Sequence, residues 1–306
     1  MATVIEATFE EHDLERQMQM LGRAARAAGH VLATAPTAAK NRALNAAAAS
    51  IRERRAIIVD ANLRDMTAAR SRDLSKAMLD RLELNPARIE AMAAGLEAIA
   101  ALDDPIGDEI TRWQRPNGLD IAKVRVPIGV IGIIYESRPN VTADAGGLCL
   151  KSGNAVVLRG GSESFHSSAA IQDCLRAGLE AAALPIAAIQ TLPTADRAAV
   201  GMMLRLSEFI DVIVPRGGRS LIERVQTESR IPVLAHLNGN CHVYVHRAAD
   251  PLMARDIALN AKMRRTGICG AAETLLVDVD ADPGILPSAL QALIEAGCEI
   301  RGDETG

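Results

Sequence analysis

The sequence is poor in aromatic residues, with only one tryptophan, two tyrosines and three phenylalanines among 306 residues. A β-sandwich core relies on large aromatic side chains, whereas a core of small aliphatic residues suits packed helices and helix-covered sheets. Hydrophobic residues make up 49% of the chain and charged residues 24%, the balance of a globular protein. This balance excludes disordered and collagen-like chains, and the length corresponds to about two domains at roughly 150 residues each.

The chain also lacks an excess of basic residues and a long apolar run. Its 34 Lys and Arg residues stand against 38 Asp and Glu residues, so the net charge is −4. Such a balance offers no field for a phosphate backbone or an anionic membrane. No apolar run approaches the ~20 residues needed to span a bilayer, and acidic residues stand where a signal peptide is basic. We therefore expect a small-molecule ligand, no nucleic acid, no membrane and a cytoplasmic location.

The cysteines form no CxxC pair and are at least 25 residues apart. They are Cys149, Cys174, Cys241, Cys269 and Cys298. An odd number at this spacing indicates a reduced protein rather than a disulfide framework. Cys149 and Cys174 lie within helical apolar patterns, which favours core positions for both.

A group of histidines near Cys241 has the residue types of a metal site but not the spacing. His242 and His246 would share a strand face, yet their separation is wrong for two ligands of one ion. His236 adds no acidic partner. We predict no metal, and hydrogen bonding or pocket lining for these residues.

The chain changes character at Asp103-Asp104-Pro105. Before it, apolar residues recur at helical spacing from Leu14, and Pro36 and Asn85-Pro86 mark helix starts. After it, apolar runs of strand length alternate with helical patterns. The predicted strands are Val130 to Tyr135, Ala155 to Leu158, Ile189 to Leu192, Ile210 to Val214, Val233 to Leu237, Val243 to Val245, Thr274 to Val277 and the start of one at Cys298 to Ile300. The predicted helices among them are Ser164 to Ala183, Ser220 to Glu228, Pro251 to Arg264 and Leu286 to Ala296. This alternation predicts an α/β fold of parallel sheets covered by helices, with a helical N-terminal layer.

Two predicted strands run into glycines that open a helix. The first is followed by Arg159-Gly160-Gly161-Ser162, and the second by Pro215-Arg216-Gly217-Gly218. Glycine allows close backbone approach to a phosphate, and free N–H groups at a helix start point toward it. Glycine after a strand is also ordinary turn chemistry, so the loops indicate either turns or a site for a phosphorylated ligand.

The candidate nucleophile is Cys269, in the run Arg264-Arg265-Thr266-Gly267-Ile268-Cys269-Gly270. Glycines on both sides favour a backbone that exposes the thiol, and the two arginines would favour the thiolate. A buried structural cysteine is the alternative for any single cysteine.

The segment from Val126 to Val141, VPIGVIGIIYESRPNV, delivers polar residues at the end of a buried strand. Glu136, Ser137, Arg138 and Asn140 follow that strand directly, where open α/β sheets bind their ligands. Asn140 also precedes a helical run, so it has the alternative of a simple helix cap.

Four blocks of sequence together resemble the γ-glutamyl phosphate reductase family of the aldehyde dehydrogenase superfamily. They are VPIGVIGIIYESRPNVTADAGGLCLKSGNAVVLRGGSES, VPRGGRSLIERV, NGNCHVYV and NAKMRRTGICGAAETLLV. The match runs in order from about Arg16 to Leu290. The resemblance implies an aldehyde-dehydrogenase-like fold, with a cofactor domain at 1–232, a β-extension for oligomerisation at about 109–126 and a catalytic domain at 233–306.

The resemblance also assigns roles to individual residues. Cys269 would be the nucleophile and Asn140 would donate its amide to the oxyanion. The NADP(H) site would consist of Arg159, Gly160, Gly161, Ser162, Pro215, Gly217 and Gly218. Apart from the resemblance, Arg138 and Arg265 are candidates for binding the substrate phosphate or α-carboxylate, because a guanidinium matches either anion, although surface salt bridges would equally explain both. Ser137 is a further candidate for substrate binding.

The implied activity is NADPH-dependent reduction of L-glutamyl 5-phosphate to L-glutamate 5-semialdehyde and phosphate, the second step of proline biosynthesis. Oxidising aldehyde dehydrogenases carry a glutamate that activates water, but the corresponding run here, His236-Leu237-Asn238-Gly239-Asn240, has no carboxylate. A thioester discharged by hydride needs no such base, so this departure favours a reductase. The resemblance further implies that the full-length form is a homo-oligomer and contacts glutamate 5-kinase.

Two alternatives remain at this level: a dehydrogenase for a different aldehyde, and an inactive nucleotide-binding fragment. Relatives of the family continue beyond the position where this sequence stops. We therefore expect a fragment that carries every motif but has little activity and an open sheet edge.

Overall fold

The computed structural model describes residues 2–192, 194, 196, 198–235, 239–266 and 268–302, with side chains in the long first helix described from residue 13 onward. The chain divides into two compact units, Met1–Ala235 and His236–Gly306. The division falls three residues beyond the boundary that the sequence predicts at 232. Cofactor binding by the first part and catalysis by the second remain predictions.

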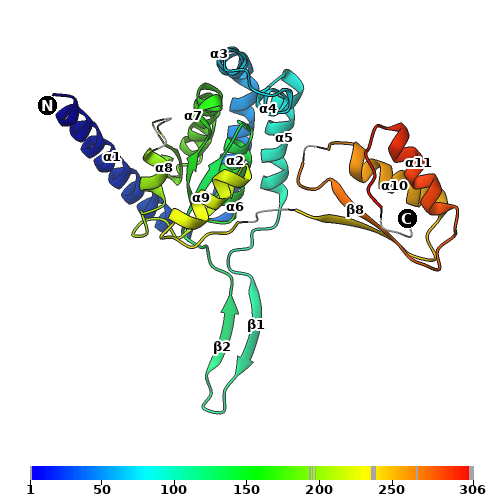
Figure 1. The fold of residues 1–306 in the computed structure, drawn as a ribbon. Coiled ribbons are helices and arrows are strands. Elements are labelled where there is room, and N and C mark those ends of the chain that lie inside the picture. The colour runs from blue at the N-terminus through cyan, green and yellow to red at the C-terminus, as the bar shows by residue number, and fades with distance from the viewer. Residues whose placement is uncertain are drawn as a thin grey trace. The chain divides into compact units, whose positions relative to one another are not determined.

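The first unit begins with helices, as the apolar spacing predicts (Figure 1). They are α1 (Ala2–Leu32), α2 (Thr37–Glu53), α3 (Arg55–Ser71), α4 (Lys76–Leu82) and α5 (Pro86–Ala101). Local chemistry explains where α5 starts: the Asn85 side chain accepts a hydrogen bond from the Arg88 N–H at 2.9 Å, and Pro86 occupies the first turn. Helix α2 likewise starts directly after Pro36. Both predicted helix starts are confirmed.

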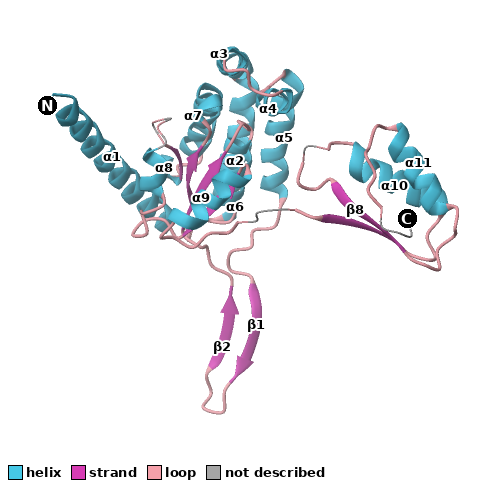
Figure 2. Cartoon of the chain, viewed as in Figure 1, coloured by secondary structure: helices cyan, strands magenta, loops and turns pink. Residues whose placement is uncertain are grey.

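A parallel sheet forms the centre of the first unit (Figure 2). Its strands are β3 (Val130–Tyr135), β4 (Ala155–Arg159), β5 (Ile189–Thr191) and β6 (Val212–Arg216), in the order β5-β4-β3-β6. Every residue of β3 and β4 is buried. Continuous burial is typical of a parallel sheet with helices on both faces, so the predicted α/β architecture is confirmed.

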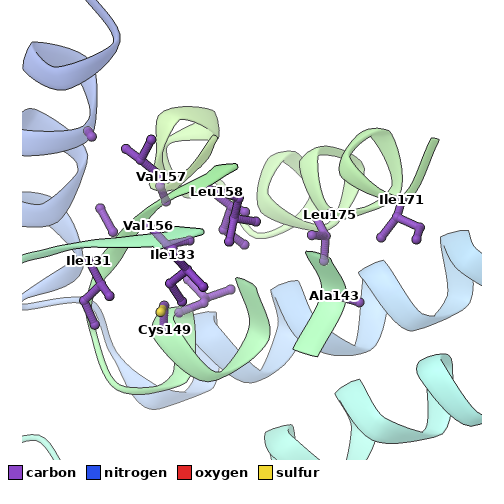
Figure 3. Packing of buried hydrophobic residues seen from close by; sticks show 14 of the residues in the cluster. Ile131, Ile133, Ala143, Cys149, Val156, Val157, Leu158, Ile171 and Leu175 are labelled. Carbon is purple, nitrogen blue, oxygen red and sulfur yellow. The ribbon is translucent and has the colours of Figure 1, made fainter. Parts of the chain in front are cut away.

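The helices that connect these strands follow the predicted order. They are α6 (Val141–Lys151), α7 (Phe165–Ala181), α8 (Ala198–Met203) and α9 (Arg219–Glu228), with 3-10 turns η1 (Ser162–Ser164) and η2 (Ile186–Ala188). Figure 3 shows the side chains of Ile131, Ile133 and Val156 packed together with the thiol of Cys149. Cys149 is 5% exposed and Cys174 is fully buried, so both are core residues, as predicted.

Helix α7 is held by contacts from distant parts of the chain. The carboxylate of Asp65 in α3 accepts hydrogen bonds from the Ser167 N–H at 2.8 Å and the Ser167 hydroxyl at 2.6 Å. Asp65 therefore caps the start of α7 from another helix. Farther along α7, a Cβ on Gly178 would lie 2.4 Å from the carbonyl oxygen of Ala43, so glycine lets α2 and α7 cross closely.

A β-hairpin lies within the predicted extension. It consists of β1 (Glu109–Gln114) and β2 (Asp120–Val124), paired antiparallel. All six residues of β1 are exposed, including Trp113, the sole tryptophan of the sequence. The predicted extension is therefore a two-stranded ribbon on which exposed apolar side chains, such as Ile110 and Trp113, stand among charged ones.

The second unit is a smaller α/β arrangement. It contains β7 (Cys241–Val245), α10 (Pro251–Met263), β8 (Ala272–Val277) and α11 (Ile285–Glu295), and β7 and β8 pair in parallel. Val245, Ala254 and Ile285 form its buried centre. The Asp250 carboxylate caps α10 by accepting a hydrogen bond from the Met253 N–H at 2.8 Å.

Two predicted strands do not form as expected, and β6, β7 and β8 each start two residues from the predicted position. Residues 298–300 form no strand: Gly297, at φ 85°, ends α11 in a left-handed turn in which the Cys298 N–H donates to the Leu293 carbonyl. Val233 forms a single bridge to Ile213, and the rest of that predicted strand to Leu237 includes residues 236–238, which lie outside the described residues. Strand β6 starts at Val212 rather than at Ile210.

None of the helices in the described part of the chain is long and apolar enough to cross a membrane.

Candidate active site

Three loops of the first unit gather at one edge of the sheet. They follow β3, β4 and β6, which are parallel neighbours, so their carboxyl ends lie together. Hydrogen bonds join the loops directly, because the β3 loop contacts both of the others. The predicted site residues in this unit lie on these loops or on the last residues of the strands.

Glu136 joins the β3 loop to the glycine loop that opens α9. Its Oε2 accepts a hydrogen bond from the Gly218 N–H at 2.8 Å. A Cβ on Gly217 would lie 2.4 Å from the same oxygen, so this close approach requires glycine. In this arrangement a carboxylate of the chain itself takes the anion position at the start of α9.

Ser137 joins the β3 loop to the β4 loop. Glu163 Oε1 accepts hydrogen bonds from the Ser137 N–H at 2.6 Å and the Ser137 hydroxyl at 2.8 Å. Ser137 is 3% exposed and has a φ of 47°, a left-handed conformation that costs about 1 to 2 kcal/mol for a residue other than glycine. The two hydrogen bonds hold this strained residue, and substrate binding by Ser137 remains a prediction.

Asn140 occupies the position before α6 but does not cap that helix. Its backbone is already helical, and its side chain makes no capping hydrogen bond. Instead, Asn140 Nδ2 donates to Asp144 Oδ2 at 2.8 Å. Burial raises the pKa of Asp144, and the hydrogen bond from Asn140 opposes that shift. The simple cap, the alternative role for Asn140, does not fit this geometry.

A cavity of about 170 Å³ opens beside the β4 loop. Its walls combine a guanidinium, a glycine turn, hydroxyls and apolar side chains from Leu158, Arg159, Gly160, Gly161, Phe165, Ser168, Ala169, Thr191, Leu192 and Thr194. A Cβ on Gly160 would lie 3.1 Å from the Tyr135 hydroxyl, so a larger residue would crowd the wall. The largely buried guanidinium of Arg159 and the hydroxyls of the cavity wall form a donor set that fits a phosphorylated nucleotide.

The remaining predicted cofactor and substrate residues differ in exposure. Pro215 is buried at the end of β6, whereas Gly217 and Gly218 are exposed. Ser162 is exposed at the start of η1, and Arg138 is partly buried in the β3 loop.

Cys269 lies in the second unit, in the turn between α10 and β8, and is exposed. Cys241 Sγ donates to the Cys269 carbonyl oxygen at 3.2 Å. A Cβ on Gly239 would lie 2.7 Å from that oxygen, so glycine allows the 239–241 segment to pass close to the Cys269 backbone. Arg265 is also exposed in this unit, while Gly267 and residues 236–238 lie outside the described residues.

The other cysteines differ from Cys269 in their environment. Burial raises the pKa of the Cys149 thiol to about 12 and also raises the pKa of Cys174. Cys241 and Cys298 are partly exposed. Since only a thiolate attacks readily, the two buried thiols are unsuited to nucleophilic chemistry.

Sequence reasoning missed two residues, Glu163 and Asp144. Glu163 belongs to the β4 loop, but its contact with Ser137 joins residues 26 apart and has no local signal. Asp144 follows Asn140 by four residues on a helix, a spacing that brings side chains together. Among the described residues, no three or more His, Cys, Asp or Glu side chains form a group that would hold a metal ion.

Comparison with known proteins identifies the family. The profile described as "Aldehyde dehydrogenase family" matches residues 6–296. The chain belongs to the aldehyde dehydrogenase family. Curated relatives named gamma-glutamyl phosphate reductase include one from Rhodospirillum rubrum, 63% identical over 97% of this chain and 70% of its own length. Another, from Paramagnetospirillum magneticum, is 62% identical over 95% of this chain and 69% of its own length.

Solved structures agree with this family. The gamma-glutamyl phosphate reductase of Thermotoga maritima has a TM-score of 0.87 and 42% identity, covering 94% of this chain and 70% of that one. The Saccharomyces cerevisiae enzyme of the same name has a TM-score of 0.68 and 30% identity, covering 92% of this chain and 69% of that one. The predicted resemblance and the aldehyde-dehydrogenase-like fold are confirmed, and the chain spans about 70% of the relatives' length.

Proposed function

We propose that this chain is an NADPH-dependent oxidoreductase that reduces L-glutamyl 5-phosphate to L-glutamate 5-semialdehyde and phosphate, the second step of proline biosynthesis. The observation that carries this proposal is 63% identity, over 97% of the chain, to a gamma-glutamyl phosphate reductase. At that identity, with the sequence motifs in place, the substrate class is the same.

Cys269 attacks the γ-acyl carbon in this mechanism. Its thiolate forms a bond to that carbon as the bond to the phosphate oxygen breaks, so phosphate leaves and a thioester remains on the sulfur. The exposure of Cys269, in a turn with glycine beside it, supports this role.

Asn140 stabilises the oxyanion that develops on the acyl oxygen. Its side-chain N–H donates to that oxygen, and the backbone N–H of Cys269 is our candidate for the second donor. The geometry before α6 supports this role, because the Asn140 amide is not consumed in capping the helix.

The β4 loop and its cavity hold the cofactor. Bound NADPH supplies the hydride that reduces the thioester to the aldehyde level. Arg159, Gly160, Gly161 and Ser162 bind its ribose and phosphate side, which agrees with the donor set of the 170 Å³ cavity. The segment from Pro215 to Gly218 would hold the pyrophosphate side of the cofactor, with the Gly218 N–H already donating to Glu136.

The substrate anions meet positively charged and hydroxyl side chains. Arg138 and Arg265 bind the phosphate or the α-carboxylate of the substrate, because a guanidinium donates two parallel hydrogen bonds to either group. Ser137 shapes the loop on which Arg138 lies.

Residues 236–240 carry no carboxylate in the sequence, HLNGN. A general base near the thioester would activate water and hydrolyse the intermediate before reduction. The sequence of this run therefore supports a reductase over an oxidising dehydrogenase.

In a chain of the relatives' full length, the hairpin of β1 and β2 contributes to a homo-oligomer in the cytoplasm, and that enzyme contacts glutamate 5-kinase. The exposed strand β1 supports self-association, because an unpaired strand edge readily accepts another strand. Trp113→Glu should shift size-exclusion elution to a smaller species. Unchanged elution would exclude the hairpin as the interface.

Phosphate-dependent reduction of NADP⁺ with glutamate 5-semialdehyde tests the activity in the reverse direction. Cys269→Ala should abolish this reaction and leave NADPH binding intact, whereas Cys149→Ala should lower stability and retain the reaction. Oxidation of other aldehydes without phosphate would contradict the proposed substrate and favour a general dehydrogenase. Full activity of Cys269→Ala would contradict the mechanism.

A further inference from the structure

Asp144 is the direct neighbour of the Asn140 amide. It lies one helical turn farther along α6, and its Oδ2 accepts the hydrogen bond from Asn140 Nδ2 at 2.8 Å. Among the described residues, Asp144 is the hydrogen-bond partner of the Asn140 side chain. The orientation of the Asn140 amide therefore depends on Asp144.

A carboxamide needs such a partner because its two ends have nearly the same size. Nδ2 carries two N–H donors, whereas Oδ1 only accepts. A half-turn of the amide would present Oδ1 to the substrate, and an acceptor there would repel an oxyanion. An ionised carboxylate is acceptor-only, so it selects Nδ2 and fixes which end of the amide faces it.

The surroundings of Asp144 indicate that this contact has a specific purpose. Asp144 is partly buried, and burial of a charge is unfavourable without compensation. Helix α5 packs against α6 (Figure 1), and its Gly95 leaves room beside the carboxylate, since a Cβ there would lie 3.8 Å from Asp144 Oδ1. The hydrogen bond from the Asn140 amide offsets part of the cost of placing a carboxylate in this position.

We propose that Asp144 is a positioning residue, which holds one N–H of the Asn140 amide so that the other N–H is directed to the oxyanion of the reacting acyl group. The inference rests on the proposed function for the oxyanion role of Asn140. In this proposal Asp144 acts through Asn140 rather than on the substrate. Its charge disfavours a nearby oxyanion, so its contribution is orientation rather than electrostatic stabilisation.

Substitutions of Asn140 and Asp144 separate the stabilisation of the oxyanion from the orientation of the amide in the phosphate-dependent assay. Asn140→Ala should lower kcat by about 10² to 10³-fold. Asp144→Ala should lower kcat by about 10-fold or more, the effect seen for residues that orient a metal ligand, with KM values within about twofold. Asp144→Asn should lie between Asp144→Ala and the unsubstituted protein, because an amide pair keeps the hydrogen bond but allows both orientations. The double variant Asn140→Ala/Asp144→Ala should have the same kcat as Asn140→Ala alone, because Asp144 acts only through the Asn140 amide, which is already missing.

A matched control exists on α11. Gln291 Nε2 donates to Glu295 Oε1 at 2.8 Å with the same four-residue spacing and the same direction. Glu295→Ala removes an equivalent pair outside the proposed site and should leave kcat unchanged. Gly95→Ala keeps the Asp144 hydrogen bond and should also retain kcat, because its added Cβ makes ordinary contact with the carboxylate.

The side-chain amide signals of Asn140 in a ¹H–¹⁵N NMR spectrum test the contact without any turnover. The Asn140→Ala spectrum assigns them by their loss. Asp144→Ala should shift both amide protons and accelerate their exchange with solvent, whereas Glu295→Ala should leave them in place. Unchanged Asn140 signals in Asp144→Ala would overturn the inference.

The kinetic outcomes distinguish the inference from the proposed function. If Asn140→Ala retains normal turnover, the proposed oxyanion role fails, and with it the catalytic purpose of the contact. If Asn140→Ala loses turnover while Asp144→Ala stays within twofold of the unsubstituted protein, the proposed function stands and the positioning role is wrong. Multiplicative losses in the double variant would also overturn it.

Discussion

The five cysteines should react with an alkylating reagent at very different rates in the folded protein. Only Cys269 is exposed, while Cys149 and Cys174 are buried. We expect iodoacetamide at pH 8 to modify Cys269 first and Cys149 last or not at all. The order follows from access and from the fraction of each thiol that is ionised.

The structure sets the size of the difference for Cys149. With a pKa of about 12, the native Cys149 thiol is about one part in 10⁴ ionised at pH 8. An ordinary cysteine with a pKa near 8.5 is about one quarter ionised at that pH. Ionisation alone therefore slows the native Cys149 by about 2,000-fold relative to an ordinary thiol, and burial slows it further.

Timed alkylation followed by peptide mass spectrometry measures each cysteine separately. In urea, where burial is lost, all five should react at similar rates, which controls for differences between peptides. In the native protein, loss of the phosphate-dependent activity should follow modification of Cys269 with the same half-time. Prior binding of the reaction product glutamate 5-semialdehyde should slow both.

Two results would refute this reasoning. Native Cys149 reacting within tenfold of Cys269 would show that the thiol is neither buried nor protonated. Activity that survives complete modification of Cys269 would remove it as the nucleophile, whatever the rates of the other cysteines.

The remaining predictions concern stability. The native Cys149 thiol keeps its proton up to about pH 12 while the unfolded thiol loses it near its ordinary pKa, so raising the pH from 8 to 10 should lower the free energy of unfolding by about 1 to 2 kcal/mol. Cys149→Ala should remove that part of the pH dependence in urea titrations, and an unchanged slope would contradict it. Gly178→Ala should lower the free energy of unfolding by about 1 to 3 kcal/mol, because its Cβ meets backbone atoms that cannot move aside. Gly201→Ala should raise stability by up to about 1 kcal/mol, because its Cβ would make only ordinary contact with the ends of the Arg224 and Glu228 side chains. If Gly178→Ala and the unsubstituted protein unfold with equal urea midpoints, followed by circular dichroism at 222 nm, the close crossing of α2 and α7 is refuted. Asp65→Ala should lower stability by about 2 kcal/mol through loss of the α7 cap, and Asp65→Asn by less, as measured by the same urea titrations.

Several elements could be predicted from the sequence because their causes are local. The Asn85-Pro86 start of α5 depends on a hydrogen bond to a residue three positions away. The continuous apolar runs of β3 and β4 predict burial by themselves, because strands covered on both faces show no alternation of apolar and polar residues. The motif around Cys269 and the block containing Asn140 were sufficient to predict the family, because they combine specific residue types in a fixed order.

Other features depended on contacts between residues far apart in sequence. The hydrogen bonds of Glu136 with Gly218 and of Asp65 with Ser167 join residues 82 and 102 positions apart. The strand predicted at residues 298–300 failed for the same reason. A strand is stabilised by its hydrogen bonds to a neighbour, and no pattern within the segment itself shows whether that neighbour is present.

The region around Asn140 combines a feature that the sequence predicts with one that only the tertiary structure decides. Sequence spacing leaves two roles open for Asn140, a helix cap and an oxyanion donor, because both favour an asparagine before a helix. The tertiary structure decided that its backbone is helical, that its amide turns to Asp144, and that Gly95 of a neighbouring helix leaves space for the carboxylate. The sequence determined which side chains this loop carries, whereas packing between helices decided how they are oriented, because orientation depends on the atoms that surround a side chain.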